Sequence, residues 1–220
     1  MTQIQQNQVD QTVEHIKVKL TGAEAGHDWW HIFRVWKLAK TIAETENCDR
    51  FVVELGALLH DIADSKFHGG DEEIGPRVAT EFLHSINVDQ EAIDHVVNII
   101  RNISFKGTRD QSNTFKSIEL DIVQDADRID AIGAIGIART FNYGGHMGRE
   151  LYNPDILPSL NMTKEEYKHN KSSSLNHFFE KLLLLKDLMN TESGKKIAIR
   201  RHDYLQGFVD QFLAEWRGEI

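Results

Sequence analysis

Apolar residues recur at helical spacing along most of the chain. Val9, Val13 and Ile16 are three or four residues apart, which places them on one face of a helix. Only three prolines occur in 220 residues, and helix-breaking clusters are rare outside 151–160. Alternating apolar and polar residues with tight-turn dipeptides, which mark β-hairpins, are missing. The pattern therefore predicts an all-α fold.

The predicted helices share an amphipathic pattern with start or stop signals at their ends. They span residues 5–20, 28–46, 50–62, 72–84, 90–101, 115–139, 172–189 and 193–216. Asp28 is expected to cap the helix that begins there. The helix over 50–62 is apolar around most of its circumference, so we expect it at the centre of the bundle. Gly133 and Gly136 favour the close approach of another helix.

The length of the chain is sufficient for one sizeable helical core. We expect a single compact domain over 1–220, with a core at about 27–140 and a C-terminal helical layer at about 164–217. The polar stretches 104–114 and 142–163 are predicted to be loops. Long loops in compact domains either bind ligands or simply connect helices, and the sequence leaves both alternatives open.

Charge and composition exclude several classes of function. A formal net charge of -9 argues against duplex nucleic-acid binding, which requires a broad basic surface. It leaves room for a small anionic substrate, because local cations and a bound metal can hold phosphates. The single cysteine, Cys48, has no internal disulfide partner. No secretory signal or membrane-length apolar stretch is visible, so we expect a cytoplasmic protein without membrane association.

The dipeptide His-Asp occurs at positions 27, 60 and 202, and only its context distinguishes the copies. The copy at 202 follows Arg200-Arg201, as expected on a solvated helix face. Asp28 of the copy at 27 is explained as a helix cap. The copy at 60 ends the apolar run Leu55–Leu59, where burying an imidazole and a carboxylate is costly unless they are paired or ligated. This copy is therefore the best candidate for chemistry.

Two imidazoles and two carboxylates form the candidate metal-binding set. His31 lies on an amphipathic helix, His60 and Asp61 follow an apolar helix, and Asp127 precedes the segment that contains Gly133. Such a set suits a divalent first-row ion with open coordination positions, whereas a structural zinc site would more often use cysteines. We expect one divalent transition-metal ion per chain, with core packing as the alternative explanation.

The spacing of these residues resembles the signature of the HD-domain phosphohydrolase superfamily. The surrounding sequence is similar to one subgroup of small bacterial HD hydrolases, the YpgQ/YedJ type. The matching phrases are GHDWWHIFRV at 26–35, LLHDIADSK at 58–66, ISFKG at 103–107 and DADRIDAIG at 125–133. The resemblance implies an all-α HD-domain bundle with the metal between central helices. It also implies hydrolysis of phosphate esters or anhydrides.

For this subgroup, the resemblance further implies metal-dependent, manganese-stimulated pyrophosphohydrolysis of nucleoside triphosphates, deoxynucleotides included. Manganese is thus the favoured ion, with iron, nickel and cobalt as alternatives. A nucleoside monophosphate phosphatase or a phosphodiesterase would use the same metal chemistry. A non-catalytic nucleotide- and metal-binding sensor is a third interpretation. The expected partner is a small-molecule nucleotide, and a homodimer is one option for the oligomeric state.

Three residues near the predicted ligands are candidates for catalysis. Helical spacing would return Asp64 to the face of His60 and Asp61, where its carboxylate is able to accept a proton from water; a cap or an outer-sphere contact is the alternative. Lys66 is either a phosphate clamp or an exposed lysine. His27 either contacts the leaving phosphate or fixes the orientation of His31.

Four cations are candidates for neutralising substrate phosphates, because guanidinium and ammonium groups donate charge-assisted hydrogen bonds. Lys106 is preferred because it lies in a polar loop, and Arg128 has Asp125 as an alternative partner. The predicted substrate-binding residues are Lys106, Arg34, Arg109 and Arg128. Base stacking on aromatic residues is a further hypothesis, against the ordinary role of such residues in the core. The aromatic residues concerned are Trp29, Trp30, Phe105 and Tyr143.

Overall fold

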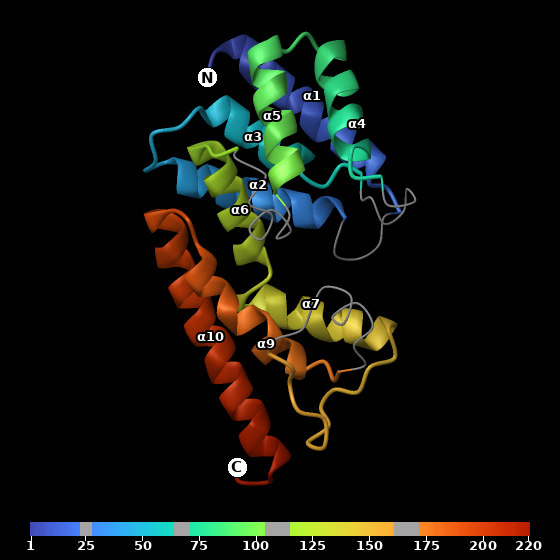
Figure 1. The fold of residues 1–220 in the computed structure, drawn as a ribbon, viewed down its shortest axis with the longest axis vertical. Coiled ribbons are helices and arrows are strands. Elements are labelled where there is room, and N and C mark those ends of the chain that lie inside the picture. The colour runs from blue at the N-terminus through green and yellow to red at the C-terminus, as the bar shows by residue number, and fades with distance from the viewer. Residues whose placement is uncertain (23–27, 64–70, 104–114, 161–171) are drawn as a thin grey trace. The chain divides into compact units, whose positions relative to one another are not determined.

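The computed structural model describes residues 1–22, 28–63, 71–103, 115–160 and 172–220. All regular secondary structure in these ranges is helical (Figure 1), which confirms the predicted all-α class. The chain divides into two compact units, Met1–Asp127 and Arg128–Ile220. The single domain expected over 1–220 stays a prediction. None of the helices in the described ranges is both long and apolar enough to cross a membrane.

The first unit is a helical bundle arranged around α3. Its helices are α1 (Gln3–Lys19), α2 (Trp29–Ala43), α3 (Arg50–Leu59), α4 (Ile74–Ser85), α5 (Gln90–Asn102) and most of α6 (Ile118–Asp130). Helix α3 packs against α1, α2 and α5, and all of its residues from Phe51 to Leu59 are buried. The apolar circumference of this helix explains its central place, as the sequence predicted.

A buried carboxylate ties α3 to α2. Glu54 is only 4% exposed, yet its Oε2 accepts a hydrogen bond of 2.9 Å from Trp36 Nε1. Lys40 Nζ lies 3.2 Å from the same oxygen. A buried charge is tolerated when it is both paired and hydrogen-bonded, so this contact orients α2 on α3 without leaving a bare carboxylate.

The second unit is organised by its long C-terminal helix. It contains α7 (Gly133–His146), α9 (Asn176–Glu180), the 3₁₀ segment η3 (Leu182–Leu188) and α10 (Glu192–Trp216), and α10 packs against α7 and η3. Aromatic rings fill the interface between these elements, with Phe141 5.9 Å from Phe208 and 5.7 Å from Phe178 between ring centroids. Contacts at these separations are typical of aromatic pairs in cores.

The single continuous helix predicted over 115–139 is wrong, because the helix is interrupted between the end of α6 and the start of α7. Gly133 has φ +76°, a conformation that residues with a Cβ atom rarely adopt. A Cβ there would also lie 3.1 Å from the Arg201 side chain. The close approach expected at Gly133 is thus made by an arginine side chain of α10. Asp130, at the end of α6, is fully buried and pairs with Arg139 on α7 at 2.8 Å, which fixes the break.

Two other sequence predictions need correction. The helix predicted over 172–189 is instead α9 followed by η3, because Lys181 leaves the helical region with φ -144°. The loop predicted over 142–163 begins later, since α7 continues to His146. The loop predicted over 104–114 lies outside the described residues.

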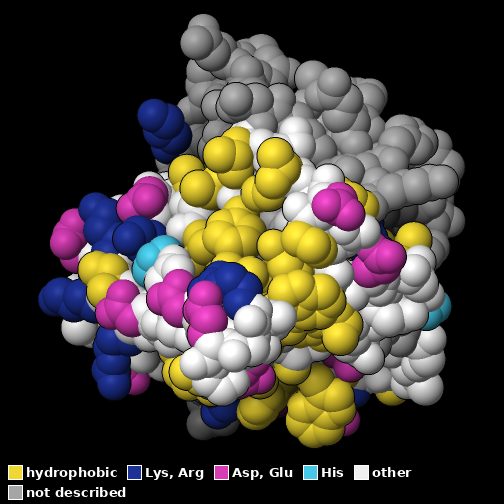
Figure 2. Space-filling model, turned by 90° about the horizontal axis from the view of Figure 1, so that it is seen from below, with side chains coloured by type: hydrophobic (Ala, Val, Ile, Leu, Met, Phe, Trp, Pro, Cys, Tyr) yellow, Lys and Arg dark blue, Asp and Glu magenta, His cyan; other side chains and the backbone are white. Residues whose placement is uncertain are grey.

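Large hydrophobic side chains remain partly exposed on the second unit. Viewed from below, the molecule shows hydrophobic side chains gathered across the middle of one face (Figure 2). The exposed large hydrophobic residues of this unit include Tyr143, Met147, Leu151, Leu157, Leu160 and Trp216. Extended apolar surface of this kind often marks a contact site for another molecule.

Candidate metal centre

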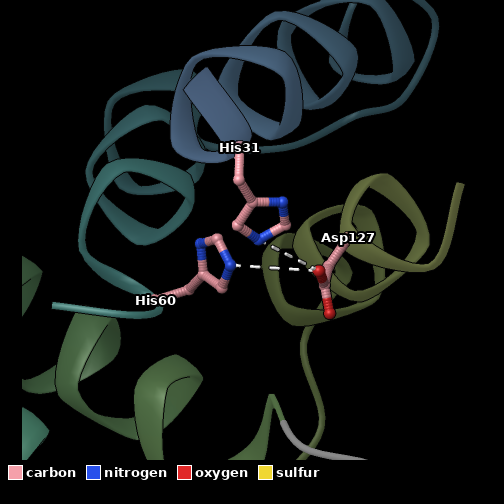
Figure 3. A group of neighbouring side chains, drawn as sticks. All are labelled: His31, His60 and Asp127. Atoms are coloured by element: carbon pink, nitrogen blue, oxygen red, sulfur yellow. Dashed lines mark ion pairs between the residues drawn. The ribbon is translucent and has the colours of Figure 1, made fainter. Parts of the chain in front are cut away.

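Three predicted ligands meet within the first unit. One ligand atom each of His31, His60 and Asp127 lies within 4.8 Å of the others. Figure 3 shows the three side chains pointing toward one another from three different segments: α2, the end of α3, and α6. His31 Nε2 is 3.5 Å and His60 Nε2 is 4.0 Å from Asp127 Oδ1. The structure therefore brings together residues that are up to 96 positions apart in the sequence.

His31 is positioned by the start of α2. Asp28 is the N-cap residue, and its carboxylate accepts a 2.9 Å hydrogen bond from the backbone N–H of His31. This cap satisfies a backbone donor that the first turn leaves unpaired, and it confirms the capping role predicted for Asp28. The His31 side chain is almost fully buried, at 4% exposure, so its orientation is set by the surrounding core.

His60 directly follows α3 and is held by its own backbone. Its Nδ1 lies 2.8 Å from the Ala57 carbonyl oxygen. A carbonyl oxygen only accepts, so Nδ1 carries a proton, and Nε2 is the ring nitrogen that faces Asp127. Metal-binding histidines are commonly oriented in this way by a second hydrogen bond. Ala57 is a contributor that reasoning from the sequence did not identify.

Gly56 of α3 contacts both α5 and α6 one turn before His60. Gly56, four residues before His60, has no side chain; a Cβ there would lie 3.5 Å from the Val123 side chain and 3.2 Å from Ile99. Val123 is four residues before Asp127, so the contact lies one turn before each ligand. Gly56 thereby leaves room for Ile99 of α5, while Val123 of α6 lies at an ordinary contact distance. Its position in the apolar run of the third helix was the sequence signal for this role.

The donor types, and the distances from both imidazoles to Asp127, fit a small divalent ion. Two atoms that each lie about 2.1 Å from one ion are separated by at most about 4.2 Å. The separations of 3.5 and 4.0 Å from the Asp127 oxygen fall within that limit. Two imidazole nitrogens with a carboxylate oxygen suit a first-row transition ion. The Asp127 side chain is 40% exposed, so the cluster has a side that solvent or a ligand is able to reach.

The structure describes Asp61 and two of the predicted phosphate-binding arginines, but not as members of the cluster. Asp61 is partly exposed, and it does not belong to the cluster found among the described residues, so its role as a fourth ligand stays a prediction. Arg34 lies on α2, one turn after His31. The Arg128 guanidinium donates a hydrogen bond to the Leu188 carbonyl of the second unit. Their predicted roles toward phosphate are not tested by these contacts.

Several predicted site residues lie outside the described ranges. They are His27, Asp64, Lys66, Lys106 and Arg109, together with Phe105 among the aromatic candidates. Of the other aromatic candidates, Trp30 is 61% exposed and contacts Phe33, as does Trp29. Tyr143 is 45% exposed and faces the Arg149 guanidinium. Base stacking on these rings stays a hypothesis.

The sequence is similar to known proteins of one family. Residues 29–132 match the HD domain family, a range that contains His31, His60, Asp61 and Asp127. The chain is 38% identical to Bacillus subtilis YpgQ over 204 residues, covering 93% of this chain and 91% of YpgQ.

Solved structures agree with this assignment over nearly the whole chain. A crystal structure of an HD-superfamily hydrolase from Bacillus thuringiensis is 43% identical with a TM-score of 0.78, covering 97% of this chain and 98% of that one. A Lactobacillus plantarum structure has a TM-score of 0.81 at 35% identity and covers 99% of each chain. YpgQ, crystallised in complex with ADP, has a TM-score of 0.75 at 36% identity and covers 96% of each chain.

We predict that removing a single cluster residue abolishes metal binding. His60→Ala and Asp127→Asn should each lower the manganese content of the purified, metal-soaked protein from near one ion per chain to near zero, as measured by elemental analysis. Asp61→Asn should lower it as well if Asp61 completes the ligand set.

His95→Ala is the matched control. His95 and Glu119 form another histidine–carboxylate contact of the first unit, with 3.3 Å between Nε2 and Oε2. Glu119 also accepts a hydrogen bond from the Asp49 backbone, and Ser117 lies 2.9 Å from the His95 ring, so this pair has a structural explanation. Wild-type metal content in His60→Ala, or a loss in His95→Ala equal to that in His60→Ala, would contradict the assignment.

Proposed function

Because this chain belongs to the HD-domain superfamily of metal-dependent phosphohydrolases, we propose that it is a nucleoside triphosphate pyrophosphohydrolase, active on deoxynucleotides as well. The reaction would release a nucleoside monophosphate and pyrophosphate. The observation that carries the proposal is the cluster of two buried imidazoles and a partly exposed carboxylate at His31, His60 and Asp127. The complex of YpgQ with ADP supports a nucleotide as the class of substrate.

The proposed ligands of the divalent ion are His31, His60 and Asp127, with Asp61 as the fourth. Manganese is favoured, with iron, nickel and cobalt as alternatives, since two imidazoles suit a transition ion and calcium favours all-oxygen sites. When bound, such an ion supplies polarisation of a phosphoryl oxygen and activation of water near neutral pH. The partial exposure of Asp127 supports access of a substrate phosphate to this side of the cluster.

Protein side chains would supply the remaining chemistry. We propose that the Asp64 carboxylate accepts the proton of the attacking water, and that His27 or Lys66 contacts the leaving phosphate. Cationic side chains would balance the charge of the triphosphate through charge-assisted hydrogen bonds. The residues proposed for that role are Lys106, Arg34, Arg109 and Arg128.

The proposed partner is a small-molecule nucleotide rather than duplex nucleic acid, in keeping with the formal net charge of -9. A cytoplasmic location and a homodimer are also proposed. The exposed hydrophobic residues of the second unit support the homodimer, because contiguous apolar surface favours association.

Product analysis tests the proposed reaction. Incubation with a panel of ribo- and deoxyribonucleoside triphosphates and Mn²⁺ should yield monophosphate and pyrophosphate in equal amounts, resolved by chromatography. An α,β-methylene analogue should resist hydrolysis, whereas a β,γ-imido analogue should be cleaved between its α and β phosphorus atoms. Mn²⁺ should support faster turnover than Ca²⁺, and chelation should stop the reaction.

The same assay separates the alternatives. Orthophosphate as the only phosphate product, or cleavage of monophosphates or diesters in preference to triphosphates, would replace the proposal with a phosphatase or phosphodiesterase. Nucleotide binding without turnover under every metal tested would indicate a sensor. His95→Ala should behave like the wild type, and His60→Ala should be inactive.

We predict that Asp64→Asn keeps metal and substrate binding but lowers turnover by about 10²–10⁴, because an amide retains the shape of the side chain and cannot accept the proton. Metal content, Michaelis constant and turnover should be measured on one preparation. Turnover near that of the wild type would remove Asp64 from the mechanism, and a parallel loss of metal would make it a ligand instead.

A further inference from the structure

A buried amide lies on α6 one turn before the proposed metal ligand Asp127. Gln124 is 8% exposed, and its Nε2 donates a 2.8 Å hydrogen bond to the carbonyl oxygen of Asn102. Asn102 is the last residue of α5, and the carbonyls at a helix end lack partners within their own helix. The bond therefore satisfies two buried polar groups at once and fixes α6 at a defined height along α5.

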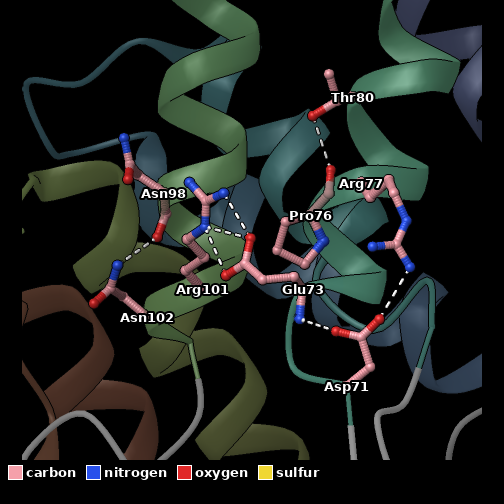
Figure 4. Close-up of polar contacts among 8 residues, drawn as sticks. All are labelled: Asp71, Glu73, Pro76, Arg77, Thr80, Asn98, Arg101 and Asn102. Atoms are coloured by element: carbon pink, nitrogen blue, oxygen red, sulfur yellow. Dashed lines mark hydrogen bonds and ion pairs between the residues drawn. The ribbon is translucent and has the colours of Figure 1, made fainter. Parts of the chain in front are cut away.

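The end of α5 that receives this hydrogen bond is itself well fixed (Figure 4). The Asn102 side chain donates to the Asn98 carbonyl at 2.8 Å. The neighbouring Arg101 guanidinium contacts both carboxylate oxygens of Glu73, with distances between 2.7 and 3.1 Å. The hydrogen bond from Arg101 holds the pKa of the Glu73 carboxyl below its ordinary value. A paired, planar contact of this kind restrains α5 against the residue that precedes α4.

The start of α4 in turn approaches the segment that carries His60. A Cβ at Gly75 would lie 3.5 Å from the carbonyl oxygen of Ala63, which is three residues after His60. The same Cβ would lie 3.4 Å from Ile100 on α5. The contacts thus run without a gap from the segment after His60, through α4 and the end of α5, to Gln124 on α6. They add to the contact of Gly56 with Val123, the residue directly before Gln124.

We infer that Gln124 is a positioning residue, which holds Asp127 at the correct height and rotation to share an ion with His31 and His60. The inference rests on the metal centre of the proposed function. Gln124 and Asp127 are three residues apart, so a slide or rotation of α6 at Gln124 is transmitted to the carboxylate through a single rigid turn. Substitution of a residue that orients a metal ligand typically weakens metal binding by about 10- to 100-fold.

The test compares two matched glutamine substitutions. Gln124→Met keeps the length and shape of the side chain and removes the donor. Gln8→Met makes the same change at another buried amide of the first unit: Gln8 is 6% exposed and donates to the carbonyls of Ile86 at 3.2 Å and Asn87 at 2.9 Å. Neither Ile86 nor Asn87 belongs to the metal cluster.

Mn²⁺ affinity should be measured by calorimetry or by the electron paramagnetic resonance signal of free Mn²⁺, at a temperature where circular dichroism shows each variant folded. Gln124→Met should bind Mn²⁺ about 10- to 100-fold more weakly than the wild type. Gln8→Met should lose comparable thermal stability and keep the wild-type affinity. At saturating Mn²⁺, the turnover of Gln124→Met should recover toward that of the wild type.

Each other outcome has a definite meaning. Equal Mn²⁺ affinity in Gln124→Met and the wild type would overturn the inference, as would an equal loss in both methionine variants. Failure of the wild type to bind Mn²⁺ would instead refute the proposed metal centre. If Gln124→Met does not fold, Gln124→Asn, whose amide is one methylene too short to reach Asn102, is measured against Gln8→Asn with the same expected contrast.

Discussion

Two imidazoles and a carboxylate share one ion only if three segments from distant parts of the chain come within a few ångströms of each other. The first unit meets this constraint by packing α3 at its centre, where Gly56 contacts Ile99 of α5 and Val123 of α6. His60 and Asp127 each lie one turn beyond that contact, and His31 enters from the capped start of α2. The core and the candidate metal centre are therefore built by the same contacts.

The proposed chemistry follows from this arrangement. Burial fixes the two imidazoles, and the Ala57 carbonyl leaves Nε2 of His60 available as a donor to a metal. The partly exposed Asp127 leaves one side of the cluster accessible. Membership of the HD-domain family makes metal-dependent phosphate hydrolysis the activity of this site, and the substrate and the cleaved bond remain proposals.

Much of the fold could be predicted from periodicity, and the failures have identifiable causes. The first five helices and the last follow strong apolar spacing, and side chains cap the starts of α1, α2, α3 and α10. The interruption between α6 and α7 could not be predicted from periodicity, because a glycine such as Gly133 is tolerated within a helix. The residue that Gly133 contacts at its φ of +76° is Arg201, far along the chain. Similarly, the leucine-rich 182–188 has helical spacing but forms a 3₁₀ segment after the break at Lys181.

The sequence was sufficient to predict the candidate metal-ligand residues, but not the residues that position them. The cost of burial beside an apolar helix pointed to His60 and Asp61, whereas His31 and Asp127 were added because they complete a set of two imidazoles and two carboxylates that resembles the HD-domain signature. Gly56 and Gln124 carry no chemistry of their own, and their roles depend on which helix lies opposite. Asp61 shows why sequence adjacency is not sufficient. Its neighbour His60 belongs to the cluster, but being next to a ligand in the sequence does not bring a second side chain to the same point.

We propose that His31, His60 and Asp127 together hold one divalent ion. The most direct measurement is anomalous diffraction at the manganese absorption edge from crystals of the Mn²⁺-soaked protein. We expect a single strong peak in each chain, within bonding distance of Nε2 of His31, Nε2 of His60 and a carboxylate oxygen of Asp127. A strong peak on other residues, with none at this cluster, would contradict it.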